Sequence, residues 1–142
     1  MDTTEFSDLE VMQRTFATNN VGLAATFHPF VAAMNARRSG TLVGIASVAG
    51  VRGLPGGGAY SSSKSAVIKL LESLRLEQSR ERIRVVTIAP GLFDTPMLAA
   101  LPEEAKASLG AQVPFPPRLG QPKEFGQLAQ AIVENEMLNG ET

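Results

Sequence analysis

The segment TLVGIAS, residues 41–47, is a short apolar run that follows Gly40 and precedes a glycine-rich loop. Its length and its β-branched residues favour a buried strand over a helix. A second run of this kind, IRVVTIA at residues 83–89, stops at Pro90-Gly91. Both runs are apolar throughout instead of alternating, which is typical of parallel strands that are covered on both faces.

Three segments around these runs have helical periodicity in their apolar residues: 7–40, 59–80 and 122–135. Pro29 lies inside the first of them, and because proline lacks a backbone N–H we expect a kink there. Helices that alternate with apolar strands predict a parallel sheet with helical crossovers. Two strands alone form only a marginal sheet in water, so we expect residues 1–142 to be one partial α/β domain.

Composition excludes several classes of function. The net charge of −1 gives no bulk attraction to nucleic acid or anionic lipid, and the absence of cysteine excludes disulfides and thiolate metal sites. The single histidine, His28, cannot form a metal cluster by itself. No apolar run is long enough to cross a bilayer, and the acidic start MDTTEFSDLE does not resemble a signal peptide. We therefore expect a cytoplasmic protein without metal, membrane or nucleic-acid partners.

The stretch GGGAYSSSK, residues 56–64, allows two kinds of chemistry. Ser61 and Lys64 fit the S-x-x-K signature of a serine nucleophile, as in penicillin-binding proteins and β-lactamases. Those enzymes also need elements of the S-D-N and K-T-G types, and SDL at residues 7–9 is the nearest match in the sequence. The serine acyl-enzyme is therefore the weaker alternative, which labelling of Ser61 by a β-lactam would support.

The other candidate for the reacting group is Tyr60. Tyr60 and Lys64 are four residues apart at the start of a helix, so their side chains share one face. A free tyrosine has a pKa of about 10, and a neighbouring ammonium group stabilises a phenolate, which makes such a pair a general acid or base. Ser47 stands thirteen residues before Tyr60, at the end of the first strand, where α/β sheets present functional groups. Asn19 stands twenty-eight residues before Ser47, inside a helix, where asparagine is unfavourable unless its side chain has a role.

Four spaced motifs together resemble the catalytic half of the short-chain dehydrogenase/reductase family, over essentially the whole chain. They are NNVG at 19–22, GIASVAG at 44–50, YSSSK at 60–64 and APGLFDTPM at 89–97. The resemblance implies the C-terminal portion of a Rossmann-like, doubly wound parallel sheet. It also implies that the N-terminal dinucleotide-binding strands and the last strand of that sheet are lacking.

The same resemblance implies a role for each candidate residue. Tyr60 exchanges a proton with the substrate oxygen, and Lys64 stabilises the phenolate and hydrogen-bonds the ribose of NAD or NADP. Ser47 holds and polarises the substrate carbonyl or hydroxyl. Asn19 keeps a water molecule in the proton relay, and Asn20 is the neighbour with which it could be confused. Residues expected to line the nicotinamide are Pro90, Gly91, Leu92 and Thr95.

The implied reaction is hydride transfer between NAD(P) and a secondary alcohol or ketone. An apolar substrate near the nicotinamide is favoured by Leu92, Phe93, Met97 and Leu98, for which the alternative is a role as packing residues of a lid. Residues 83–141 resemble short-chain 3-hydroxyacyl-CoA (hydroxysteroid) dehydrogenases, whereas residues 39–78 are closer to general short-chain oxidoreductases.

The sequence departs from the family in having no glycine-rich phosphate-binding turn after a first strand. The alternative hypothesis is therefore a catalytically inactive fragment that acts as an oligomerising α/β module. In the family, the helices that correspond to residues 7–36 and 60–80 pack against a second subunit. Because exposed strand edges also invite pairing, we expect a homo-oligomer that uses these two helices.

Overall fold

The computed structural model describes residues 8–140 and 142. The chain divides into two compact units. The first unit comprises the described part of Met1–Ala89 with Asn135–Thr142, and the second comprises Pro90–Glu134.

The first unit contains the parallel sheet that the sequence predicts. Strand β1, Gly40–Ile45, pairs with strand β2, Ile83–Ile88, in a register that runs from Gly40 opposite Ile83 to Ile45 opposite Ile88. Helix α3, Gly58–Gln78, is the crossover between the two strands. The predicted parallel α/β fold is thereby confirmed.

The expected long helix over residues 7–40 is a chain of three helical elements. Helix α1, Leu9–Phe16, continues into a π turn, Ala17–Val21, and then into helix α2, Gly22–Arg37. The backbone N–H of Gly22 donates to the carbonyl of Ala17, five residues earlier, which is the wider hydrogen bonding of a π turn. Pro29 lies inside α2, which continues past it to Arg37, and the π turn at residues 17–21 is a separate departure from regular α-helix.

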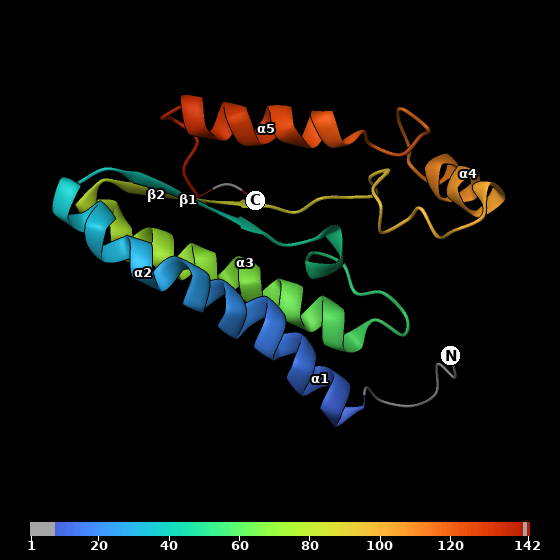
Figure 1. Ribbon diagram of the computed structural model, residues 1–142, viewed down its shortest axis with the longest axis horizontal. Coiled ribbons are helices and arrows are strands. Elements are labelled where there is room, and N and C mark those ends of the chain that lie inside the picture. The colour runs from blue at the N-terminus through green and yellow to red at the C-terminus, as the bar shows by residue number, and fades with distance from the viewer. Residues whose placement is uncertain (1–7, 141) are drawn as a thin grey trace. The chain divides into compact units, whose positions relative to one another are not determined.

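Helices α2 and α3 lie side by side along one face of the two strands (Figure 1). The core between these helices and the sheet consists of Leu42, Ala46, Val67, Leu71, Ile83 and Val85. Gly44 of β1 lets α3 approach, because a Cβ atom there would meet the side chain of Leu71. The helices therefore pack directly on the strand that leads to Ser47.

Burial differs between the two strands, which only partly matches the expectation that both are covered on two faces. Strand β2 is buried at five of its six residues. In β1, buried Leu42 and Gly44 are followed by Ile45, which is 42% exposed. The outer edge of β2 is partly occupied, because Gly140 donates its backbone N–H to the Val85 carbonyl at 2.9 Å.

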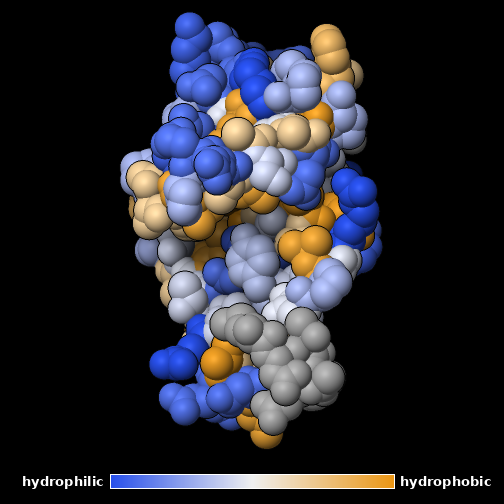
Figure 2. Space-filling view, turned by 90° about the vertical axis from the view of Figure 1, so that its right-hand side faces the viewer, coloured by the Kyte–Doolittle hydropathy of each residue, from blue (hydrophilic) through white to orange (hydrophobic). Residues whose placement is uncertain are grey.

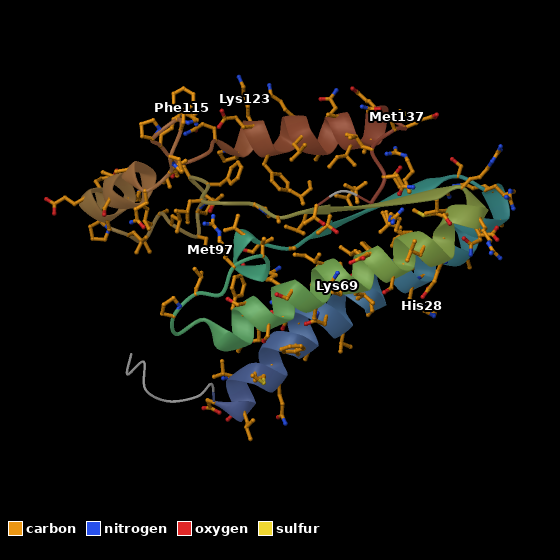
Figure 3. The ribbon with its side chains drawn as sticks, turned by 180° about the vertical axis from the view of Figure 1, so that it is seen from behind. His28, Lys69, Met97, Phe115, Lys123 and Met137 are labelled. Atoms are coloured by element: carbon orange, nitrogen blue, oxygen red, sulfur yellow. The ribbon has the colours of Figure 1, made fainter. Side chains whose placement is uncertain are left out.

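The second unit consists of helix α4, Glu103–Ala111, helix α5, Pro122–Glu134, and the segments that precede them. The predicted helix over residues 122–135 is confirmed to within one residue. The rings of Phe93 and Phe125 meet edge to face, with centroids 6.0 Å apart. Phe115 and Lys123 extend from this unit toward solvent (Figure 3).

Within the described part of the chain, no helix is long and apolar enough to cross a membrane. On the face that Figure 2 shows, hydrophobic residues are interspersed with hydrophilic ones.

The core packing predicts that Leu71 contributes strongly to stability. Leu71 is 1% exposed, whereas Leu76 on the same helix is 61% exposed. Leu71→Ala should lower the free energy of unfolding by about 2–5 kcal/mol, because it leaves a cavity under the sheet. The matched control Leu76→Ala should change this free energy by less than about 0.5 kcal/mol. Urea unfolding followed by circular dichroism measures both, and equal effects would contradict the core described here.

Candidate active site

Tyr60 and Lys64 lie on the first two turns of α3, next to the end of β1. The Lys64 Nζ atom donates a hydrogen bond to the backbone carbonyl of Ile45, the last residue of β1, at 3.0 Å. The same Nζ atom lies 5.8 Å from the centroid of the Tyr60 ring, at the outer limit of a cation–π contact. Tyr60 is 45% exposed, so its ring is accessible to a ligand. The Lys64 amine, in contrast, is fixed to the end of β1.

Ser47 comes two residues after β1 and caps a short 3-10 turn, Val48–Gly50. Its Oγ atom accepts a hydrogen bond from the Ala49 backbone N–H at 3.1 Å. Since that bond uses only a lone pair, the hydroxyl hydrogen of Ser47 can still be donated to a substrate oxygen.

The 3-10 turn that carries Ser47 is docked on α3 at Lys64. A Cβ atom on Gly50 would lie 2.7 Å from the backbone carbon of Lys64, closer than such atoms can approach. The Ser65 Oγ atom donates to the Gly50 carbonyl at 2.6 Å. Gly50 and Ser65 therefore fix the 3-10 turn against α3 at Lys64, one helical turn after Tyr60.

Asn19 and Asn20 belong to the π turn, and the structure brings both to Ser63 of α3. The Asn19 Nδ2 atom donates to the Ser63 Oγ atom at 2.9 Å, and the Asn20 Nδ2 atom donates to the Ser63 carbonyl at 3.0 Å. Asn19 is thus joined to the residue immediately before Lys64. Its side-chain amide is bound to Ser63, not to Tyr60 or Lys64 themselves.

The residues expected to line the nicotinamide begin the second unit, directly after β2 in the sequence. The Leu92 carbonyl accepts the Gly120 N–H at 2.9 Å, and the Thr95 carbonyl accepts the Leu98 N–H at 2.9 Å. Gly91 is exposed, with no atom within 4 Å of a Cβ built on it. The loop is thus held by backbone bonds at Leu92 and Thr95 and is open at Gly91.

An ion pair between Arg118 and Glu124 holds the segment around Gly120 within the second unit. The Arg118 Nη2 atom lies 2.6 Å from the Glu124 Oε1 atom, and Nη1 lies 2.9 Å from Oε2. The Gln121 backbone N–H donates to the same carboxylate at 2.6 Å. Hydrogen bonding by the Arg118 guanidinium, followed by that of the Gln121 N–H, lowers the pKa of Glu124 to about 2. The ion pair therefore anchors Arg118 to the start of α5. Gly120, which bonds to Leu92, lies between Arg118 and Glu124 in the sequence.

Sequence reasoning missed three residues that hold the candidate site together: Ser63, Ser65 and Gly50. Their signal was only that they flank Lys64 or follow Ser47. Asn20 was named only as the neighbour with which Asn19 could be confused, and the structure shows that both asparagines bind Ser63. Among residues 8–140 and 142, no group of three or more histidine, aspartate and glutamate side chains could hold a metal ion.

Parallel strands joined by a helical crossover define an α/β protein, and the candidate side chain of Ser47 lies beyond the carboxyl end of β1, where such folds commonly bind ligands. The family model described as short chain dehydrogenase matches residues 1–106. The chain therefore belongs to the short-chain dehydrogenase family.

Individual relatives agree with this assignment. The chain is 45% identical over 139 residues to 3-hydroxyacyl-CoA dehydrogenase type-2 of Drosophila melanogaster, covering 94% of this chain and 54% of that protein. It is 34% identical over 123 residues to a 3-oxoacyl-(acyl-carrier-protein) reductase of Thermotoga maritima, covering 84% of this chain and 50% of the relative. The crystal structure of 3-hydroxyacyl-CoA dehydrogenase type-2 from Mycobacterium avium matches with a TM-score of 0.91 at 34% identity, over 99% of this chain and 57% of that one. The chain thus spans about half the length of the relatives it matches.

The contact between Gly50 and Lys64 predicts a sharp difference between two glycines of the same loop. Gly50→Ala should lower the free energy of unfolding by about 1–3 kcal/mol, because the new methyl group must push the 3-10 turn away from the helix backbone. Gly53 has no atom within 4 Å of the corresponding position, so Gly53→Ala should change stability by less than about 1 kcal/mol. Urea denaturation compares the two variants. A Gly50→Ala protein as stable as Gly53→Ala would show that the turn is not docked on Lys64.

The lowered pKa of Glu124 predicts an acid-dependent contribution to stability. The folded-state value of about 2 lies below the ordinary value of about 4.3, so the ion pair stabilises the fold above pH 4.3. This stabilisation is lost as the pH falls from there toward 2. Arg118→Gln should raise the pKa of Glu124 toward its ordinary range, as measured by NMR titration of the carboxyl carbon.

Lys123→Gln is the control for this titration, since the Lys123 charge is the smallest of the influences that lower the pKa of Glu124. It should move the midpoint far less than Arg118→Gln does. A Glu124 midpoint that stays near 2 in Arg118→Gln would contradict the assigned cause.

Proposed function

We propose that this chain is the catalytic portion of an NAD(P)-dependent oxidoreductase that interconverts a secondary alcohol and a ketone. The observation that carries the proposal is the Lys64 amine, which is bound to the end of β1 and adjacent to the exposed ring of Tyr60. A phenol next to an ammonium group can exchange a proton with a substrate oxygen.

In the proposed reaction, the Tyr60 hydroxyl gives its proton to the carbonyl oxygen during reduction and takes it back during oxidation. The Ser47 hydroxyl donates a hydrogen bond to the same oxygen, using the hydrogen that its bond with Ala49 leaves available. Asn19 keeps a water molecule in the proton relay, with its amide held by Ser63.

The residues present suit the nicotinamide end of the cofactor. A lysine ammonium has three donors, and Lys64 uses one of them on Ile45, so two remain for ribose hydroxyls. The loop of Pro90, Leu92 and Thr95 is proposed to line the ring, and within the second unit no atom lies within 4 Å of a Cβ atom built on Gly91. When bound, NAD or NADP supplies or accepts the hydride.

The names of the relatives support a narrower substrate class. The matched proteins of Drosophila melanogaster and Mycobacterium avium are named 3-hydroxyacyl-CoA dehydrogenase type-2, and that of Thermotoga maritima is named a 3-oxoacyl-(acyl-carrier-protein) reductase. A 3-hydroxyacyl or 3-oxoacyl thioester is therefore the proposed substrate. Its apolar acyl chain agrees with the apolar character of Leu92, Phe93, Met97 and Leu98.

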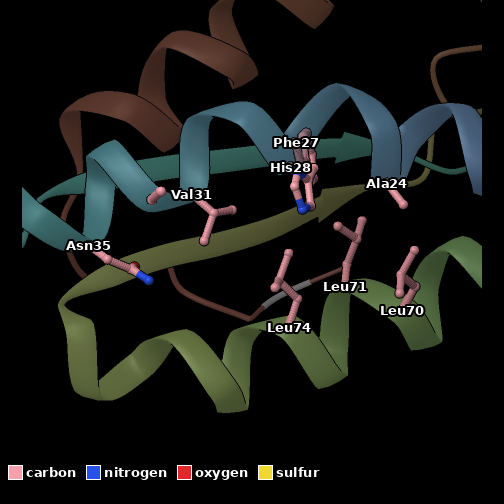
Figure 4. Close-up of a pocket in the computed structure, with 9 residues that line it drawn as sticks. Ala24, Phe27, His28, Val31, Asn35, Leu70, Leu71 and Leu74 are labelled. Atoms are coloured by element: carbon pink, nitrogen blue, oxygen red, sulfur yellow. The ribbon is translucent and has the colours of Figure 1, made fainter.

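We also propose that the protein forms a homo-oligomer through α2 and α3. A groove of about 420 Å³ lies between these helices, and Phe27 and Val31 of α2 approach Leu70 and Leu74 of α3 across it (Figure 4). Phe30 of α2 is 57% exposed nearby in the sequence. Burying such apolar surface against a second copy would stabilise the assembly.

Substitution of the only tyrosine tests the proposed chemistry. Tyr60→Phe should lower NADH-dependent reduction of acetoacetyl-CoA by at least about a hundredfold, because it removes the proton donor but not the ring. Far-UV circular dichroism should remain unchanged. Turnover undiminished in Tyr60→Phe would refute the assigned role.

A binding measurement separates this proposal from the alternative of an inactive oligomerising module. Calorimetric titration of the chain with NADH should give heats of binding at micromolar to millimolar concentrations. Sedimentation of the same sample reports self-association. An associated chain that binds no NADH would favour the module, since the sequence has no glycine-rich turn to hold a pyrophosphate.

A further inference from the structure

Ser63 is the best-shielded polar residue next to the proposed catalytic pair. It lies on α3 directly before Lys64 and three residues after Tyr60, and it is 0% exposed. A buried hydroxyl costs free energy unless it is hydrogen-bonded, and alanine is the better helix former. The presence of serine at this position therefore calls for a role for its hydroxyl.

The polar groups of Ser63 connect three of the residues around it. Its Oγ atom accepts from the Asn19 amide at 2.9 Å and donates to the Tyr60 carbonyl at 2.8 Å. Its own carbonyl accepts from the Asn20 amide at 3.0 Å. The Ser63 hydroxyl thus donates its one hydrogen to Tyr60 of α3 and accepts a hydrogen bond from Asn19 of the π turn.

The two serines before Ser63 make no such connection. The Ser62 Oγ atom bonds only to carbonyls of its own helix, those of Gly58 and Ala59. The Ser61 Oγ atom is buried without a partner among the described residues. Of the three consecutive serines, Ser63 is the one that ties α3 to the segment carrying Asn19.

The π turn gives this connection its importance. A π turn is rarer than α-helix and often occurs at functional sites, so the side-chain contacts that it makes help to stabilise it. Both asparagines of the Ala17–Val21 turn donate to Ser63, one to its side chain and one to its backbone. Loss of the hydroxyl would leave the Asn19 amide unpaired in a partly buried place.

We propose that Ser63 is a positioning residue, which fixes Asn19 in place relative to Tyr60 and Lys64. This inference rests on the proposed function, because the placement affects proton transfer only if those residues carry it out. Ser63 does not touch the reacting atoms itself in this proposal. It acts by holding the π turn in a fixed position relative to α3.

The test compares Ser63→Ala with the matched control Ser62→Ala in the full chain. The first readout is hydrogen exchange of the Asn19 side-chain amide by NMR, which requires no turnover. Exchange should be about tenfold faster in Ser63→Ala, corresponding to one net hydrogen bond, and unchanged in Ser62→Ala. Equal exchange in the two variants would overturn the inference.

A second readout distinguishes positioning from a structural role alone. The sequence has one tyrosine and no tryptophan, so ultraviolet emission of the chain reports on Tyr60. Ser63→Ala should change the quenching of this emission by acrylamide, and adding Asn19→Ala should have little further effect, because both remove the same bond. In NADH-dependent reduction, kcat should fall about tenfold while KM for NADH stays within about twofold.

The outcomes separate this inference from the proposed function. Faster Asn19 exchange with unchanged Tyr60 emission and unchanged kcat would overturn the positioning role. A wild-type chain with no turnover would count against the proposed function, while the exchange and emission measurements would still decide whether Ser63 joins Asn19 to the catalytic helix.

Discussion

The hydrogen bond from the Lys64 amine to the Ile45 carbonyl is the contact on which the site depends. It joins the first turns of α3 to the carboxyl end of β1 at 3.0 Å, and it holds the amine near the Tyr60 ring. A lysine on a free helix surface would lose much side-chain entropy to stay in one position. Here the carbonyl at the strand end provides the compensating interaction. The geometry of the candidate site is therefore a consequence of how the crossover helix returns to its sheet.

Close packing allows that return. Because Gly44 has no side chain, Leu71 of α3 packs directly against β1. Because Gly50 has none either, the Lys64 backbone packs directly against the 3-10 turn. One of these contacts lies before the end of β1 in the sequence and the other after it. Ser63 and Ser65, the neighbours of Lys64, then bind the π turn and the 3-10 turn respectively. Three consecutive residues of one helix thus organise the segments that carry Asn19, Lys64 and Ser47. A scaffold of this kind suits a site that must hold several groups in a fixed geometry.

Much of this arrangement could be predicted from the sequence. The apolar runs and the helical periodicities predicted the parallel strands and the crossover, because burial dictates both patterns. The spacing of Tyr60 and Lys64 predicted a shared helix face. The π turn could not be predicted, since its alternative is an ordinary helix of the same composition, and its anchor, Ser63, lies forty-four residues beyond Asn19. The contact of Gly50 with the Lys64 backbone was equally hidden, because a glycine in a loop is common and only the packed structure shows which atoms approach it.

The most direct test of this account is the proximity of the Lys64 side chain to the ring of Tyr60 in solution. Tyr60 is the single tyrosine, so tyrosine-selective labelling makes its ring protons unambiguous in a nuclear Overhauser spectrum. The account predicts cross-peaks between these protons and the side-chain methylenes of Lys64, together with slowed exchange of the Lys64 ammonium protons because they are bound to Ile45. A Lys64 ammonium in fast exchange with water, without cross-peaks to the ring, would contradict it.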